Sequence, residues 1–231
     1  MVKKYSKVSK KTKSQKYSAI RWIAAIGIVL LLIGIGFIVL RQQKNMADKT
    51  LSVPNVVSLD KSLGSENAPV VVVEYGDYQC PACGQFATIV KPKIVEEFVN
   101  SGQVRFVFRS FQFIGEESQW AAEAAECANE QGKFWEFYDK LYSSQAGENA
   151  GAYRKENLEG FAAELGLKTE QFNQCLATGK YEDKVKAETL EAQTLGLRST
   201  PSVFVNGELV EGGGQYEILS AKILQAASKF K

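Results

Sequence analysis

Histidine is absent from the 231 residues of this sequence. A Ser-His-Asp triad, a Cys-His protease pair and a zinc or haem site with histidine ligands are therefore excluded. Cysteine is scarce, with four residues in the whole chain, and no acidic residue precedes Trp22. The net charge of +2 hides this uneven distribution of charge, and a length of 231 residues allows one sizeable core with little room for a second.

The chain begins with a run of positive charge. Eight basic residues precede Trp22, namely Lys3, Lys4, Lys7, Lys10, Lys11, Lys13, Lys16 and Arg21. Nucleic-acid binding is one interpretation of such a run, but the uncharged apolar span Trp22–Leu40 follows at once and is about long enough to cross a bilayer as a helix. We interpret residues 1–21 as a cytoplasmic basic tail and residues 22–40 as a transmembrane signal anchor, with no nucleic acid as partner.

A cleaved signal peptide is the alternative to an anchor. Such peptides have a shorter apolar region and end in a small-residue cleavage site, whereas Arg41-Gln42-Gln43-Lys44 follows here. The basic side of an anchor stays in the cytoplasm, which puts everything after Arg41 outside. The polar residues 41–60 are then an extracytoplasmic linker, and the protein is a single-pass protein of the cell membrane. Four cysteines can persist as disulfides in that compartment.

The first regular elements predict a β-α-β unit. The run Val70–Tyr75 is typical of a strand buried on both faces. Cys80-Pro81-Ala82-Cys83 begins a helix that continues towards Phe98, because Pro81 suits the first helical turn. Pro92 falls inside this helix and should kink it. Val104–Phe108 is the next predicted strand.

The rest of the chain predicts a helical block followed by a hairpin and a last helix. Apolar residues recur at helical spacing from Glu116 to Leu197. Asn206-Gly207 separates two short β-type runs and is a strong hairpin signal. Gly212–Gly214 has no Lys-Ser or Lys-Thr after it, so it is a turn and not a phosphate-binding loop. The final helix is amphipathic, with Ile218, Leu219, Ile223 and Leu224.

This order of elements, with Cys-x-x-Cys at the first strand-to-helix junction, resembles the thioredoxin fold with a helical insertion. It is most similar to the DsbA-like thiol–disulfide oxidoreductases. The resemblance runs from Asn67 to the C-terminus and rests on Glu74–Cys83, Gly132–Trp135 and Gly196–Gly207. It implies an α/β fold: a thioredoxin-like mixed sheet with an inserted all-helical subdomain. In this chain the domain would be preceded by the one transmembrane helix expected at residues 22–40. The thioredoxin-like domain would comprise residues 61–231, with the insertion at about 115–197.

The physical chemistry of Cys80 and Cys83 supports redox catalysis. A cysteine at a helix N-terminus faces free N–H groups and the positive end of the helix dipole, which favour the reactive thiolate. Cys80 should be the exposed sulfur that is attacked and Cys83 the interior one, with Pro81 and Ala82 as the active-site dipeptide. A static disulfide or half of a zinc site is the alternative. A four-cysteine zinc site would need a second pair with knuckle spacing, which the sequence lacks, so we predict neither metal nor cofactor.

Two further positions gain a role from the resemblance. Glu74 ends a run of four valines, where burial would disfavour its charge. It matches the buried acid that relays a proton to the interior cysteine, although a strand-end glutamate can also reach solvent. Thr200-Pro201 resembles the cis-proline loop that faces the redox pair and binds extended substrate, although an ordinary trans proline before a strand is the alternative.

The remaining cysteines, Cys127 and Cys175, lie on apolar faces of two predicted helices. Our hypothesis is a structural disulfide that links these helices, and two buried free thiols are the alternative. The two positions are 175 − 127 = 48 residues apart. The loop-closure entropy then gives roughly 4 kcal/mol of stabilisation, less any strain.

The resemblance implies an extracytoplasmic oxidoreductase that introduces disulfides into reduced exported proteins. A membrane partner would reoxidise it, either a quinone-linked DsbB-like or a VKOR-like protein. A reductase or isomerase of the same fold, or a redox-silent peptide-binding module, are the alternatives. Ala82 stands where strongly oxidising members carry a histidine that stabilises the thiolate, which leaves the oxidising strength open.

Overall fold

The computed structural model describes Gly34 and residues 60–230. The predicted basic tail, the rest of the predicted anchor and the linker up to residue 59 lie outside the described residues. In the part of the chain that is described, no helix has both the length and the hydropathy needed to cross a membrane.

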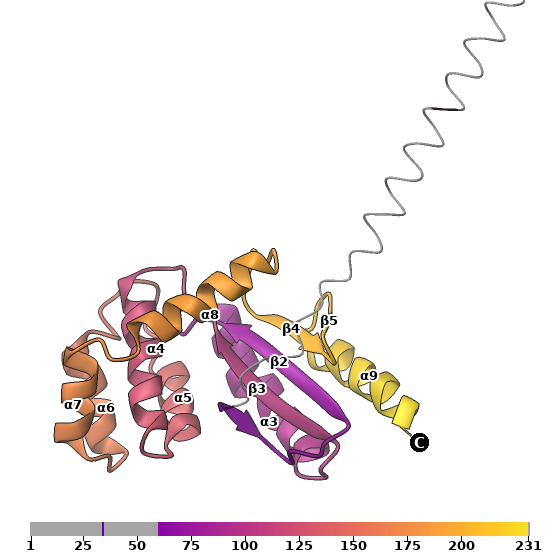
Figure 1. Cartoon of the computed structure of the whole chain (residues 1–231), viewed down its shortest axis with the longest axis horizontal. Helices are drawn as coiled ribbons and strands as arrows, with labels where there is room; N and C mark the ends of the chain where they lie inside the picture. The colour runs from indigo at the N-terminus through magenta and orange to yellow at the C-terminus, as the bar shows by residue number, and fades with distance from the viewer. Residues whose placement is uncertain (1–33, 35–59, 231) are drawn as a thin grey trace, which may run out of the picture. The chain divides into compact units, whose positions relative to one another are not determined.

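A mixed sheet forms the centre of the described domain, with its strands in the order β1-β3-β2-β4-β5 (Figure 1). The strands are β1 (Ser62–Leu63), β2 (Val70–Gly76), β3 (Val104–Ser110), β4 (Ser202–Val205) and β5 (Glu208–Leu209). Strands β2 and β3 run parallel, and β4 runs antiparallel to β2. The central strand β2 is almost wholly buried, as its β-branched run predicts. Edge strand β1 was not predicted, because two residues have no periodicity.

One helical run connects β2 to β3 and consists of four short segments. These are α2 (Pro81–Gln85), the π-helix η1 (Phe86–Val90), α3 (Lys91–Ile94) and the π-helix η2 (Val95–Val99). Pro92 lies in the first turn of α3, directly after a π segment. The irregularity expected at this proline therefore takes the form of a wider π turn before it, which is a known way to accommodate a break in the α-helical hydrogen-bond ladder.

The predicted helical insertion is confirmed between β3 and β4. Its helices are α4 (Glu116–Asn129), α5 (Phe134–Ser143), α6 (Lys155–Glu164), α7 (Thr169–Ala177) and α8 (Glu182–Thr194). They stand beside the sheet, and α8 runs from them back towards β4 (Figure 1). Small alanines on one face of α4 allow close packing into the main core cluster. After β5, α9 (Tyr216–Ala227) and the 3-10 turn η3 (Ser228–Phe230) end the described chain.

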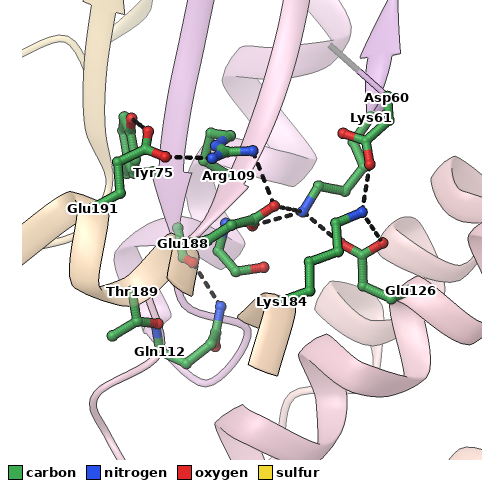
Figure 2. A network of polar contacts seen from close by, with 12 residues as sticks. Asp60, Lys61, Tyr75, Arg109, Gln112, Glu126, Lys184, Glu188, Thr189 and Glu191 are labelled. Carbon is green, nitrogen blue, oxygen red and sulfur yellow. Dashed lines mark hydrogen bonds and ion pairs between the residues drawn. The ribbon is translucent and has the colours of Figure 1, made fainter. Parts of the chain in front are cut away.

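A buried polar network attaches the insertion to the sheet (Figure 2). Lys61, just before β1, lies 2.7 Å from carboxylate oxygens of both Glu126 on α4 and Glu188 on α8. Arg109 on β3 pairs with the same Glu188 at 3.1 Å and with Glu191 one turn further along α8. The side chains of Lys61, Glu126 and Glu188 are at most 3% exposed. Nothing in the sequence pattern predicted this network, because its members are far apart in the chain.

Candidate active site

Cys80 and Cys83 lie at the start of the helical run that follows β2. Cys80 is the last extended residue before α2, and Pro81 occupies the first helical position, where its missing N–H has no partner to lose. Cys80 is half-buried, whereas Cys83 is fully buried, and both are free thiols. The local sequence thus leaves one sulfur accessible and points the other into the core.

The two thiols differ strongly in acidity. The pKa of Cys80 is lowered from 9.0 to about 6, chiefly by a hydrogen bond from the Cys83 thiol. Burial opposes this shift, whereas Thr200 and the backbone N–H groups of Cys83 and Ala82 add to it. Burial raises the pKa of Cys83 well above its ordinary value. The neighbouring thiol thus contributes more than the helix N–H groups on which the sequence argument relied.

The carboxyl group of Glu74 is completely buried in β2. The Tyr138 hydroxyl donates to Glu74 Oε2 over 2.9 Å, and Oε1 has no hydrogen-bond partner among the described residues. Burial raises the pKa of Glu74 from 4.5 to about 8, although Tyr138 and the charge of Lys91 lower it in part. This carboxyl group is therefore mainly protonated at neutral pH.

Lys91 is a member of this site that sequence analysis missed. It is buried on α3, and its Nζ lies 4.4 Å from the ring centroid of Tyr138. The same ammonium pairs with the exposed Asp139 at 2.6 Å. Lys91 stands eight residues after Cys83, which is about two helical turns. Helical spacing therefore places Lys91 on the same face of the helical run as Cys83. Nothing in the pattern indicated that a lysine there would be buried.

The Thr200–Pro201 peptide bond is cis, and its loop faces the reactive sulfur. The Cys80 thiol lies 3.4 Å from the backbone oxygen of Thr200, to which it donates. The Thr200 hydroxyl is buried without a partner among the described residues. Topology brings the loop here because β4, which follows it, pairs with β2, which precedes Cys80.

Asp77 organises the turn between β2 and Cys80. Its fully buried carboxylate accepts hydrogen bonds from the Gln79 N–H at 2.8 Å and the Ser118 hydroxyl at 2.6 Å. It also accepts from the N–H groups of Phe113 at 2.9 Å and Ile114 at 3.2 Å. Asp77 was given no role of its own from the sequence, although aspartate in a turn after a strand is a common local hydrogen-bond acceptor.

Cys127 on α4 and Cys175 on α7 are not part of this site. They are joined by a disulfide, with an S–S distance of 2.04 Å and a Cα–Cα distance of 5.9 Å. Both sulfurs are buried within the helical insertion. The four cysteines thus divide into a free pair at the strand-to-helix junction and a linked pair between two helices.

Comparisons with known proteins agree with this geometry. The family described as thioredoxin matches residues 58–225. The probable disulfide bond formation protein D of Bacillus anthracis is 32% identical over 200 residues, 85% of this chain and 90% of that protein. The disulfide bond formation protein D of Bacillus subtilis is 30% identical over 165 residues, 70% of this chain and 74% of that protein. The crystal structure of oxidised BdbD from Bacillus subtilis matches with a TM-score of 0.71 and 28% identity, over 77% of this chain and 98% of that one.

Proposed function

The chain belongs to the thioredoxin family that includes these disulfide bond formation proteins, and we propose that its Cys80–Cys83 pair forms disulfides in exported proteins. The protein is a thiol–disulfide oxidoreductase. The main support for oxidation of the substrate by the enzyme is the acidity of the Cys80 thiol, whose pKa is about 6. A stabilised thiolate favours the reduced enzyme, so the oxidised enzyme tends to pass its disulfide to a substrate.

The proposed reaction starts from the oxidised pair. A substrate thiolate attacks the accessible Cys80 sulfur, the Cys80–Cys83 bond breaks, and the electron pair leaves with Cys83. A second substrate thiolate then attacks the substrate sulfur of the mixed disulfide and releases Cys80. Two electrons pass from the substrate to the enzyme. The low pKa of Cys80 makes it a good leaving group at neutral pH.

Glu74 acts in this proposal as the proton relay for the interior sulfur. The departing Cys83 takes up a proton, because burial raises its pKa well above the ordinary value. Glu74 is protonated at neutral pH and has a pKa of about 8, so it can give up that proton and recover it later. Reoxidation requires the reverse transfer, from Cys83 to the Glu74 carboxylate.

Thr200 and Pro201 are the proposed substrate-binding residues. Their loop lies at the Cys80 sulfur, with the Thr200 backbone oxygen 3.4 Å away. An extended substrate segment can add to such a backbone edge, which would bring its cysteine to Cys80. Pro81 and Ala82 form the dipeptide between the redox cysteines, and Ala82 contributes its backbone N–H to the Cys80 thiolate.

We further propose that residues 22–40 anchor the domain on the outer side of the membrane. The basic tail before this segment and its uncharged length support that topology. An anchored oxidase needs a regenerating oxidant, and a membrane quinone-linked protein of the DsbB-like or VKOR-like kind would supply it. The reductase alternative predicts instead that the cysteine pair is kept reduced in cells.

Equilibration of the purified domain with glutathione tests the oxidising direction. We expect a reduction potential above that of thioredoxin, at roughly −270 mV, and below about −120 mV, because Ala82 adds no charge to stabilise the thiolate. A Cys83→Ala variant should trap mixed disulfides with reduced unfolded protein through Cys80, and a Cys80→Ala variant should trap none. A potential at or below that of thioredoxin, with the pair reduced in cells, would overturn the oxidase proposal.

A further inference from the structure

The side chain of Gln145, just after α5, lies against the turn that carries Cys80. Its Nε2 donates to the backbone oxygen of Tyr78 at 2.8 Å and to that of Cys80 at 3.0 Å. A side-chain amide has two N–H donors, so both are used on this one turn. The contact joins the helical insertion to the reactive cysteine across 65 positions of sequence.

The same amide is packed against the first turns of the active-site helix. A Cβ placed on Gly84 would lie 2.3 Å from Gln145 Oε1 and 2.9 Å from its Cδ. Position 84 therefore has no room for a side chain while the amide is in place. The Gly84 N–H also donates to the Cys80 backbone oxygen, at 3.1 Å. The Cys80 carbonyl thus accepts hydrogen bonds from both Gln145 and Gly84.

Tyr153 provides a natural comparison for Gln145. Its hydroxyl lies 3.1 Å from the Tyr78 backbone oxygen and 2.7 Å from that of Leu141. Both side chains thus come from the insertion and both support Tyr78. The hydrogen bonds of the described residues include one from Gln145 to Cys80 itself and none from Tyr153 to it.

The donors that stabilise the Cys80 thiolate all occupy fixed positions around the sulfur. They are the Cys83 thiol and the backbone N–H groups of Ala82 and Cys83 at the start of α2. We propose that Gln145 is a positioning residue for the reactive cysteine: its amide fixes the backbone from Tyr78 to Cys80 and so holds the Cys80 sulfur against these donors. The proposal rests on the redox function proposed above, and gives the helical insertion a role in setting the oxidising strength.

A Gln145→Met variant tests this role, because methionine is similar in length and has no N–H donor. We expect the Cys80 pKa, measured from the ultraviolet absorbance of the thiolate, to rise by about one unit. The equilibrium constant for reduction of the enzyme by glutathione at pH 7 should then fall about fivefold, or about 20 mV. Tyr153→Phe, the matched control, should lower the urea midpoint and leave the Cys80 pKa unchanged.

Gly84→Ala tests the same contact from the other side. The new methyl group must displace the Gln145 amide, whereas alanine itself favours a helix over glycine. We expect the same rise in the Cys80 pKa, without a loss of helix stability, and no further rise when both changes are combined. This variant decides the question alone if Gln145→Met does not fold.

An unchanged Cys80 pKa in folded Gly84→Ala or Gln145→Met protein would overturn the proposal. A rise in the Cys80 pKa of Tyr153→Phe as large as that in Gln145→Met would also overturn it. Failure of the proposed oxidase function would be seen separately, as a reduction potential of the wild-type protein at or below that of thioredoxin. The pKa comparison between variants does not depend on the direction of electron flow.

Discussion

Glu74 and Lys91 both contact Tyr138, and Lys91 in turn pairs with Asp139, so the three ionisable groups form a series from the core to the surface. The carboxyl group at the inner end is buried, whereas the Asp139 side chain is 62% exposed. Lys91 lowers the pKa of Glu74, against the larger effect of burial. Because Lys91 pairs with Asp139 and not with Glu74, part of its field is neutralised on the solvent side. We therefore expect the surface aspartate to influence the protonation of Glu74 through Lys91, without contact between the two carboxyl groups.

An Asp139→Asn variant should lower the pKa of Glu74 by up to about one unit. The change removes the negative charge that compensates Lys91 and frees the ammonium to turn towards Glu74, and both effects favour the carboxylate. The carboxyl carbon chemical shift of Glu74, followed by NMR against pH, measures this directly. A pKa that stays the same or rises would contradict the proposed series.

The raised pKa of Glu74 also predicts how stability depends on pH. The unfolded chain releases this proton at about 4.5 and the folded chain at about 8, so between these values only the folded state binds it. Stability contributed by Glu74 therefore falls as pH rises through this window, by about 1.4 kcal/mol per pH unit. Glu74→Gln should remove the slope, and should slow turnover while the fold is kept.

Urea unfolding of the wild type and the Glu74→Gln variant, at the same redox state and at several pH values, checks this sign. With the Cys80–Cys83 pair oxidised in both proteins, neither cysteine titrates, so the two curves differ only through Glu74. A gap between the two that does not widen with pH would show that Glu74 is charged in the folded domain.

Helices α4 and α8 are attached to the sheet by charged side chains buried between them (Figure 2). Burial alone would raise the pKa of Glu188, but Lys61 and Arg109 lower it below its ordinary value. Glu188 also accepts the Ser110 N–H at 2.7 Å. Because α8 leads into the loop of Thr200, these contacts also fix the element that positions the substrate-binding backbone.

Loss of one partner in this network should be costly. A Lys61→Met variant leaves Glu126 and Glu188 with less compensating charge in a dry environment, and breaking a buried ion pair costs about 3–5 kcal/mol. Urea unfolding measures the change in the free energy of unfolding. Lys186→Ala, at the exposed pair with Glu182, is the control and should not move the midpoint. Equal midpoints for the two variants would contradict a structural role for the network.

The Cys127–Cys175 disulfide should stabilise the contact between α4 and α7. A bridge that closes 48 residues removes unfolded-state entropy worth roughly 4 kcal/mol, less any strain. Replacing both cysteines with alanine should lower the free energy of unfolding by up to that amount and leave the Cys80 pKa unchanged. Mass spectrometry after non-reducing digestion should find the linked peptides. Alkylation of both thiols in unreduced, unfolded protein would refute the bridge.

Across the whole molecule, the structural features that could be predicted are those encoded by residues close together in the sequence. The valines of β2, the Cys-x-x-Cys motif and Asn206-Gly207 each act within a few residues, and together they gave the order of elements. Most polar contacts between distant segments were not predicted, such as those of Gln145 with Cys80 and of Lys61 with Glu188 across 65 and 127 positions. The Cys127–Cys175 disulfide and the loop of Thr200 at Cys80 are the exceptions, and they came from the scarcity of cysteine and from the family resemblance. Periodicity also overestimated burial in α9, where Leu224 of the predicted apolar set is 57% exposed.

The same distinction applies to the candidate site. Cys80, Cys83 and Glu74 were visible because each is chemically unusual where it stands. Asp77 and Lys91 act through hydrogen bonds and charges that exist only in the folded chain, so their residue types alone carried no signal. The sequence pattern therefore located the reacting atoms better than the buried polar groups that surround them.

The membrane topology of the whole chain can be tested with a protease. A basic tail retained in the cytoplasm before the apolar segment 22–40 would place the redox domain outside, where disulfides persist. A protease added to intact spheroplasts should then digest the domain after Arg41 and leave the N-terminal tail protected, as detected with tags on the two ends. Lysed cells, the control, should lose both tags.

Recovery of the domain in the soluble fraction without its apolar segment would show cleavage instead of anchoring. Because the redox chemistry needs only the compartment and not the anchor, that outcome would leave the oxidase proposal intact while removing the tether that would keep it near a membrane reoxidant.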